Sequence, residues 1–179
     1  NRGLVRDAAV LVGGDAIVVS DQPPPPAFIE EAHRRGLRTA IAINFPSMGR
    51  APDERGGSSR LVSVKAVSEG YPLRGRLEVR GPGDSADQSV ASGPAPGTVW
   101  VDPQVLDALG LKLGDTLLLG DASLPIARVI TYEPDRGVGF LSFSPRVMLN
   151  AADLPATGLV QPASRVGYRL AVAAPGGDP

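Results

Sequence analysis

Short apolar runs separated by Gly- and Pro-rich turns dominate the chain, a pattern that predicts many short strands rather than long helices. Runs that are densely apolar, or that alternate between apolar and polar residues, predict strands at residues 16–20, 37–45, 60–67, 76–80, 98–101, 138–143 and 164–173. Residues 116–131 predict a tight hairpin whose turn is formed by Gly120 and Asp121.

Helical spacing of apolar residues is found only in short segments. It predicts helices over residues 3–11, 26–35, 103–109 and 145–150. Asp102 is the expected N-cap of the third helix and Gly110 its stop. The strand–helix–strand unit at 16–45 predicts a right-handed crossover between parallel neighbours. The Gly-, Pro- and Ser-rich residues 46–59 and 81–97 are predicted to be loops, the second of them mobile and dispensable for folding.

Composition narrows the possible functions. The 18 Lys and Arg residues are balanced by 19 Asp and Glu residues, so the chain lacks the positive excess that binds nucleic acid. It has no cysteine and a single histidine, His33, which excludes zinc fingers, iron–sulfur clusters, thiol catalysis and multi-histidine metal sites. No G-x-S-x-G elbow or phosphate loop is present. We therefore expect no catalytic residue, no metal and no cofactor.

A few large apolar residues are candidates for contact with a hydrophobic ligand or a partner, because aromatic and Met side chains pack adaptably. These candidates are Phe45, Met48, Tyr71 and Trp100. An ordinary core position explains most of them better. That explanation is weakest for Met48, which lies in a segment predicted to be a polar loop.

Several segments carry a family resemblance. The run VWVDPQVLDALGLKLGDTLLLGDASLPIARVITYEPDRG, at 99–137, combines a strand, a short helix ending in Leu-Gly, and a Gly-Asp-Thr hairpin. In this order the elements resemble the extracytoplasmic module of MacB/FtsX-like ABC-transporter permeases. The runs RLVSVKAV, GYPLRG and DLPATGLVQPASRVGYRL are similar to YbbP-type permeases in particular.

The resemblance implies an α+β fold with two lobes. Residues 1–74 and 138–179 would form a membrane-proximal α/β lobe, and residues 75–137 an inserted β-rich lobe. Strands 16–20 and 165–173 would then lie in one lobe, with both ends of the chain returning to the membrane. Since the chain begins without Met and has no apolar run of about 18 residues, we expect it to be a segment of a longer, membrane-embedded parent.

The resemblance also implies a function. The chain would be a non-catalytic domain on the periplasmic side of the bacterial inner membrane, coupled to a cytoplasmic ATPase subunit that hydrolyses ATP. It would transmit ATP-driven motion to the export or extraction of a hydrophobic or lipidic substrate, or to an envelope partner such as a periplasmic esterase. The alternative is a stand-alone periplasmic binding module for a lipid or hydrophobic peptide. A hydrolase is a third possibility, which the single histidine disfavours.

Overall fold

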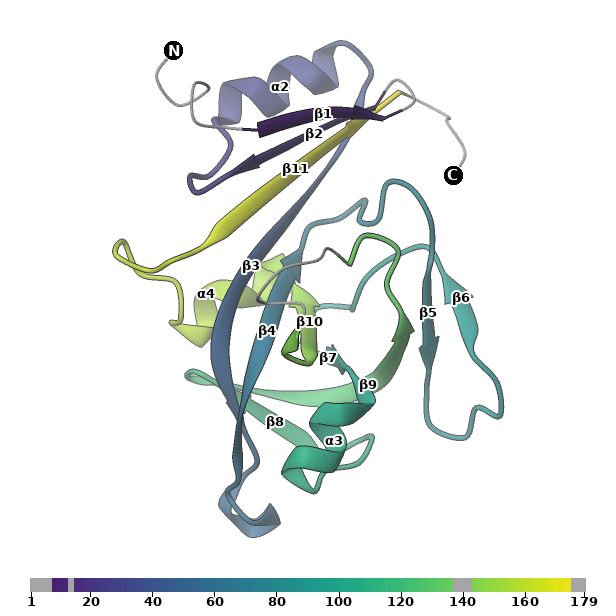
Figure 1. Ribbon diagram of the computed structural model, residues 1–179, viewed down its shortest axis with the longest axis vertical. Helices are drawn as coiled ribbons and strands as arrows, with labels where there is room; N and C mark the ends of the chain where they lie inside the picture. The colour runs from purple at the N-terminus through teal and green to yellow at the C-terminus, as the bar shows by residue number, and fades with distance from the viewer. Residues whose placement is uncertain (1–7, 13–14, 137–142, 175–179) are drawn as a thin grey trace.

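Eleven strands form one mixed sheet, accompanied by few helices, in the computed structural model, which describes residues 8–12, 15–136 and 143–174 (Figure 1). The strands are β1 (Ala8–Val12), β2 (Asp15–Ser20), β3 (Arg38–Arg50), β4 (Ser59–Val67), β5 (Leu77–Arg80), β6 (Gln88–Val90), β7 (Val99–Val101), β8 (Thr116–Leu119), β9 (Ala122–Tyr132), β10 (Arg146–Asn150) and β11 (Gly167–Ala173). The helices are α2 (Pro26–Arg34), α3 (Pro103–Leu109) and α4 (Leu154–Thr157), with short 3-10 turns η1 (Asp53–Arg55) and η3 (Ala151–Asp153). A large sheet with a few short helices confirms the predicted α+β class.

The strand order is β1-β2-β11-β3-β4-β10-β7-β9-β5-β6, and β8 pairs with both β3 and β9. β4 with β10 and β7 with β9 are the parallel pairs of this sheet, and the other described pairs are antiparallel. Residues 16–20 and 165–173, predicted to lie together, contribute adjacent paired strands, with Ala16 opposite Val172.

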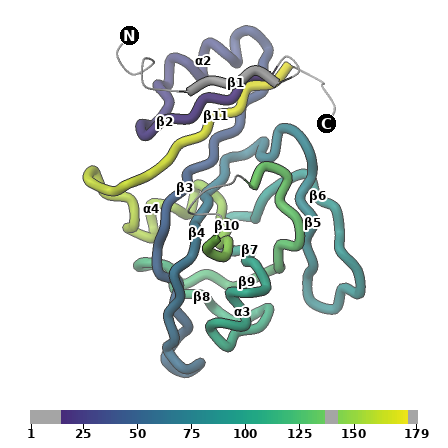
Figure 2. Tube along the Cα trace, in the orientation of Figure 1, coloured from purple at the N-terminus to yellow at the C-terminus, as the bar shows by residue number. Residues whose placement is uncertain are grey.

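Strand β3 is a long strand that runs through both parts of the sheet (Figures 1 and 2). It has 13 residues, which makes it about 43 Å long at ~3.3 Å per residue. Its first part, from Arg38 to Asn44, pairs with β11, and its second part, from Ala42 to Arg50, pairs with β4. We call β1, β2, β11 and α2 the terminal sheet region, and β4 to β10 with their helices the central sheet region; β3 runs through both.

The core lies in the central sheet region. Successive residues of β7 and β10 belong alternately to two buried clusters, so the clusters lie on opposite faces of the sheet. In β10, for example, Val147 and Leu149 enter the first cluster and Met148 enters the second, and all three have no exposed surface. Helix α3 contributes Val105 and Leu109 to the first cluster. The central strands are therefore covered on both faces.

The hairpin and the helix α3 agree with their predictions. Leu119 lies opposite Ala122, which leaves Gly120 and Asp121 as the two turn residues. Gly120 has a φ of 58°, and a Cβ there would lie 2.1 Å from the Thr157 carbonyl oxygen, so both the backbone conformation and the close approach require glycine. The predicted stop of α3, Gly110, is left-handed at a φ of 66°.

Asp102 precedes α3 as predicted, but it does not cap that helix with its side chain. Its carboxylate instead accepts a 2.7 Å hydrogen bond from the Arg146 backbone N–H at the start of β10. Asp102, which directly follows β7, is thus hydrogen-bonded to the start of β10. The local sequence pattern does not reveal this contact.

Two predicted helices were wrong. Within residues 3–11, the described part from Ala8 forms strand β1, which pairs with β2 in a continuous register; residues 1–7 lie outside the described part. Residues 145–150 form β10 rather than a helix. A short apolar run does not separate a buried helix from a strand buried on both faces, and pairing with strands distant in sequence decides the conformation.

The predicted parallel neighbours are also corrected. β2 and β3 run parallel to each other, but β11 lies between them and is antiparallel to both. The local strand–helix–strand pattern cannot show that the last strand of the chain inserts at this position.

Both predicted loops contain regular structure. β3 continues to Arg50, so residues 46–50 of the predicted loop 46–59 are strand. Within 81–97, Gln88–Val90 forms β6 and pairs with β5, so this segment is not wholly irregular. Residues 138–142 of the strand predicted at 138–143 lie outside the described part of the chain, and Phe143 is not in a strand.

Candidate functional site

A cluster of charged side chains is buried where β4, β10 and the end of β9 meet. The Lys65 ammonium lies 2.8 Å from a carboxylate oxygen of Glu133, and the Arg146 guanidinium donates hydrogen bonds of 3.0 and 3.1 Å to the same carboxylate. The side chains of Lys65 and Glu133 are only 3% exposed. Buried charges are tolerated when they are paired and hydrogen-bonded, so these three residues depend on one another.

Tyr71 and Asp135 extend this cluster toward the surface. The Tyr71 hydroxyl accepts a 2.9 Å hydrogen bond from Lys65 and donates one of 2.7 Å to Asp135, which also receives a 2.9 Å bond from Lys65. We call Lys65, Tyr71, Glu133, Asp135 and Arg146 the buried charge cluster. Its two cations balance its two carboxylates.

The environment fixes the protonation of the cluster. Burial raises the pKa of the Tyr71 hydroxyl, and the neighbouring Asp135 and Glu133 carboxylates raise it further. Burial is the largest single influence on Glu133 and Asp135 and would raise their pKa values. The nearby positive charges, led by Lys65, and the hydrogen bonds that both carboxylates accept together outweigh it, so both pKa values lie below the ordinary range. Tyr71 therefore stays protonated and both acids stay ionised at neutral pH.

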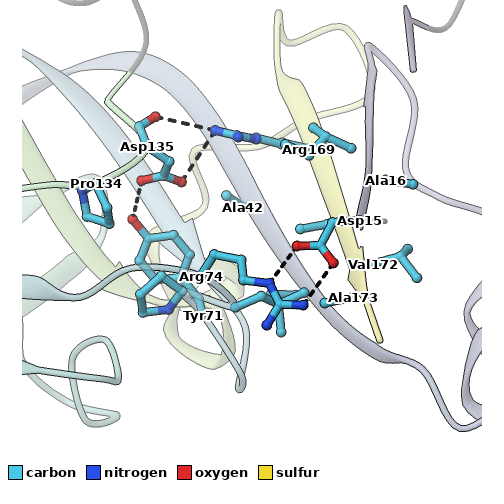
Figure 3. Close-up of a pocket in the computed structure, with 15 residues that line it drawn as sticks. Asp15, Ala16, Ala42, Tyr71, Arg74, Pro134, Asp135, Arg169, Val172 and Ala173 are labelled. Carbon is cyan, nitrogen blue, oxygen red and sulfur yellow. Dashed lines mark hydrogen bonds and ion pairs between the residues drawn. The ribbon is translucent and has the colours of Figure 1, made fainter. Parts of the chain in front are cut away.

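A pocket of about 240 Å³ lies beside this cluster, between the terminal sheet region and the segments 71–74 and 134–135 (Figure 3). We call it the junction pocket. One wall is formed by β2, β11 and the first part of β3. It carries five alanines and two larger apolar residues, namely Ala16, Ala40, Ala42, Ala171 and Ala173 with Ile17 and Val172. The opposite wall carries Tyr71, Pro72, Leu73 and Pro134.

Two ion pairs link the walls of the junction pocket (Figure 3). Arg74 donates hydrogen bonds of 2.5 and 2.9 Å to the two carboxylate oxygens of Asp15 at the start of β2. Arg169 of β11 lies 3.4 Å from an Asp135 carboxylate oxygen and donates to the Asp135 carbonyl oxygen at 3.3 Å. The hydrogen bonds from Arg74 are the main reason that the pKa of Asp15 lies below its usual value.

The four apolar residues suggested by the sequence do not gather at one place. Phe45 is buried in the first core cluster and Trp100 in the second, where the Arg128 guanidinium lies 5.5 Å from the Trp100 ring centre. Tyr71 lines the junction pocket, and Met48 is 52% exposed. Contact of these residues with a ligand or partner stays a prediction.

Sequence reasoning missed the charged residues at this junction. Lys65 is one of two lysines in the chain and lies within the apolar strand RLVSVKAV, a signal that could have suggested a buried, paired charge. Glu133 and Asp135 follow the predicted hairpin and lie in a short polar segment, EPDR, without a pattern of their own. Lys65 lies 68 residues from Glu133 and Arg146 lies 13 residues from it in another strand, so the local pattern offers no means of pairing them.

The remaining candidate chemistry is sparse in residues 8–12, 15–136 and 143–174. Within these ranges no three His, Cys, Asp or Glu side chains form a group suited to a metal ion. His33 is at the surface, and its Nε2 lies 3.0 Å from the Thr39 hydroxyl. No helix in this part of the chain is long and apolar enough to cross a membrane.

The chain has a sequence relative among known proteins. No protein-family model matches the chain. By sequence it is similar to a segment of an ABC transporter permease. That relative is the uncharacterized ABC transporter permease YbbP of Escherichia coli (strain K12), with 38% identity over 168 residues, which are 94% of this chain and 19% of the relative. The resemblance to YbbP-type permeases is confirmed, and the chain spans about a fifth of the relative's length.

A solved structure of a domain assigned to a permease of Porphyromonas gingivalis is also similar, with a TM-score of 0.49 and 15% identity. The match covers 79% of this chain and 63% of that chain. A likeness this weak supports no statement about the present fold or function.

Proposed function

We propose that the chain is a non-catalytic, periplasmic domain of a MacB/FtsX-like ABC-transporter permease in the bacterial inner membrane. The observation that carries this proposal is the 38% identity to YbbP across nearly the whole chain, which also favours it over a stand-alone binding module. ATP would be hydrolysed by a separate cytoplasmic subunit. The domain would pass the resulting motion to a hydrophobic or lipidic substrate, or to an envelope partner such as an esterase.

The sheet order supports insertion between membrane segments. β1 and β11, the first and last described strands, are separated only by β2. Chain segments on both sides of the domain can therefore connect to the same region of the molecule. In this proposal the terminal sheet region faces the membrane, and residues 75–137 project away from it.

The proposed division into lobes, 1–74 with 138–179 and 75–137, is compatible with a shared sheet. β10 pairs with β4 on one side and with β7 on the other, so strands from both proposed lobes are hydrogen-bonded to each other. The inserted part would then move together with β4 and β10 rather than independently of them.

β3 supports a role in transmitting motion. It is a continuous strand of 13 residues, and its far end at Gly49 and Arg50 also pairs with β8. Because a paired strand resists stretching and bending in its hydrogen-bonded plane, displacement at the terminal sheet region would be carried toward β8 and α3. The exposed Met48, which lies opposite the exposed Leu61, is the proposed partner contact at that end.

Cysteine labelling tests the location. Met48→Cys and Tyr132→Cys introduce thiols at side chains that are 52% and 53% exposed, in a chain without native cysteine. In the full-length permease, with other cysteines replaced, both should react with a membrane-impermeant maleimide once the outer membrane is permeabilised. A buried Leu149→Cys should stay unlabelled until denaturation.

A cysteine in the ATPase subunit is the second control, because it should react only after the inner membrane is broken. If Met48→Cys and Tyr132→Cys also react only at that stage, the periplasmic assignment is wrong.

A further inference from the structure

We infer that the two ion pairs across the junction pocket, Arg74 with Asp15 and Arg169 with Asp135, form a latch that holds the terminal sheet region against the central sheet region and opens reversibly. The use of this latch in transport rests on the proposed function. The presence of the latch does not, because it follows from how the two regions are joined.

The backbone connection between the two regions is narrow. β3 pairs with both β11 and β4 only over Ala42–Asn44, since β11 pairing ends at Asn44 and β4 pairing begins at Ala42. Pro46, two residues further on, has no N–H to donate to a ladder. Beyond this overlap, Ile41 and Ser68 exchange two hydrogen bonds across the junction, of 2.8 and 2.9 Å. In the proposed opening, the change of twist falls near Ala42–Pro46, where the three strands overlap least.

Side-chain packing across the junction is made mainly by small side chains on the terminal side. The terminal sheet wall offers mainly alanines to the junction pocket, and about 240 Å³ remains unfilled. An unfilled space contributes no dispersion contacts between its walls. The alanines Ala42 and Ala173 belong to the second core cluster together with Leu73. Separating the walls would therefore expose mainly small side chains, whereas any separation within the central sheet region would expose large ones.

The ion pairs are suited to reversible opening. The Arg74 and Arg169 side chains are both 29% exposed, so water can solvate their charges when the pairs separate. Asp135 would retain its bonds from Lys65 and Tyr71. Asp15 would keep the backbone hydrogen bond of Ala174 and the nearby charge of Arg38.

Opening therefore leaves no buried charge without a partner among these groups. By contrast, separating Glu133 from Lys65 and Arg146 would leave buried charges uncompensated, at a cost of several kcal/mol. In the proposed open state the two regions separate about β3, while the buried charge cluster stays intact.

Distance measurements test the latch in the full-length permease with its ATPase subunit. Spin labels at Val19→Cys in β2 and Tyr132→Cys in β9 report on the two regions, since these side chains are 47% and 53% exposed. Labels at Leu61→Cys and Tyr132→Cys form the control pair within the central sheet region. Three proteins are compared. The first keeps Arg74 and Arg169, the second carries Arg74→Gln with Arg169→Gln, and the third carries Arg74→Lys with Arg169→Lys as the matched control.

In the Gln variant, the fraction of molecules whose Val19–Tyr132 label distance differs from the main distance of the parent should rise severalfold. The Leu61–Tyr132 distances should stay unchanged. The Lys variant should stay closer to the parent, because it keeps both charges. An unchanged Val19–Tyr132 distribution in the Gln variant, or equal broadening of the control pair, would overturn the latch.

The same samples, trapped with a non-hydrolysable ATP analogue, test the proposed function separately. If the Gln substitutions alter the Val19–Tyr132 distances but the nucleotide does not, the latch stands and ATP-driven transmission fails. If the nucleotide alters these distances but the Gln substitutions do not, transmission stands and the latch fails.

Discussion

The terminal and central sheet regions use the same strand pairing but differ in how deeply their side chains are buried. In β10, four of the five residues are buried, whereas in β11 only Leu170 and Ala173 of seven are. Both strands are dense in apolar residues, so their sequences look alike. The difference teaches that strands in one hydrogen-bonded sheet can be covered to very different extents, and local opening is expected where few apolar contacts are buried.

Electrostatics sharpens this contrast. The pairs inside the central sheet region, such as Lys65 with Glu133, are almost inaccessible to water. Those that tie the terminal sheet region down are partly exposed. Exposed ion pairs contribute little to stability because water competes for both charges. The central sheet region is thus built as one body, and the terminal sheet region is attached to it by contacts that can open.

The largest effect is expected for Glu133→Gln. Removing this carboxylate leaves Lys65 and Arg146 buried with less compensation, which should lower the free energy of unfolding by roughly 3–5 kcal/mol. Chemical denaturation of the 179-residue chain measures it. Asp87→Asn is the control, because it removes a surface pair with Arg80 and should cost less than about 1 kcal/mol. Equal effects of the two substitutions would contradict the contrast between buried and exposed pairs.

Matched leucine truncations compare the two regions directly. Leu149 in β10 and Leu170 in β11 are 0% and 2% exposed. Leu149→Ala should cost about 4 kcal/mol because it opens a cavity in a rigid core, and Leu170→Ala about 2 kcal/mol because its surroundings can relax. Denaturant midpoints of both variants check this order. A larger loss for Leu170→Ala would show that the terminal sheet region is the better packed of the two.

Low pH should lower the free energy of unfolding because Glu133 and Asp135 become protonated. Their pKa values lie below those of the unfolded chain, so the unfolded state binds more protons as the pH falls. The stability that these two carboxylates contribute should be fully present above about pH 5 and should be lost as the pH drops through about 4 and below. A pH series of denaturation curves measures this, and Glu133→Gln should make the decrease shallower. A parallel decrease in both proteins would remove Glu133 as a cause.

The smallest effect on stability is expected for Met48→Ser. Its side chain is half exposed on the far part of β3, so the free energy of unfolding should change by less than about 0.5 kcal/mol. If Met48 contacts a partner, transport by the full-length permease should nevertheless fall. Ser47→Thr, at the neighbouring position on the other face of β3, is the control. Loss of stability in Met48→Ser would assign the residue to packing instead.

Elements with local signals were predictable from the sequence. The two-residue turn at Gly120 and Asp121, α3 with its stop at Gly110, and most strands agree with the structure. Elements decided by distant partners were not. β10 was mistaken for a helix, and the position of β11 between β2 and β3 has no signature within either segment.

The candidate site was predicted only in part. Tyr71 was singled out for its apolar ring, but its place in the structure depends equally on the hydroxyl held between Lys65 and Asp135. The charged residues around it come from β4, β10 and the segment after β9. Their proximity depends on the sheet order, which periodicity and composition do not contain.

Native-state hydrogen exchange tests the central claim, that the terminal sheet region opens more easily than the central sheet region. Amides in β2 and β11 should exchange through local openings whose free energy is clearly below that of global unfolding. Amides in β4 and β10 should exchange only with global unfolding. If β11 and β10 exchange with the same free energy over a range of denaturant concentrations, the two regions form one cooperative unit and the account is contradicted.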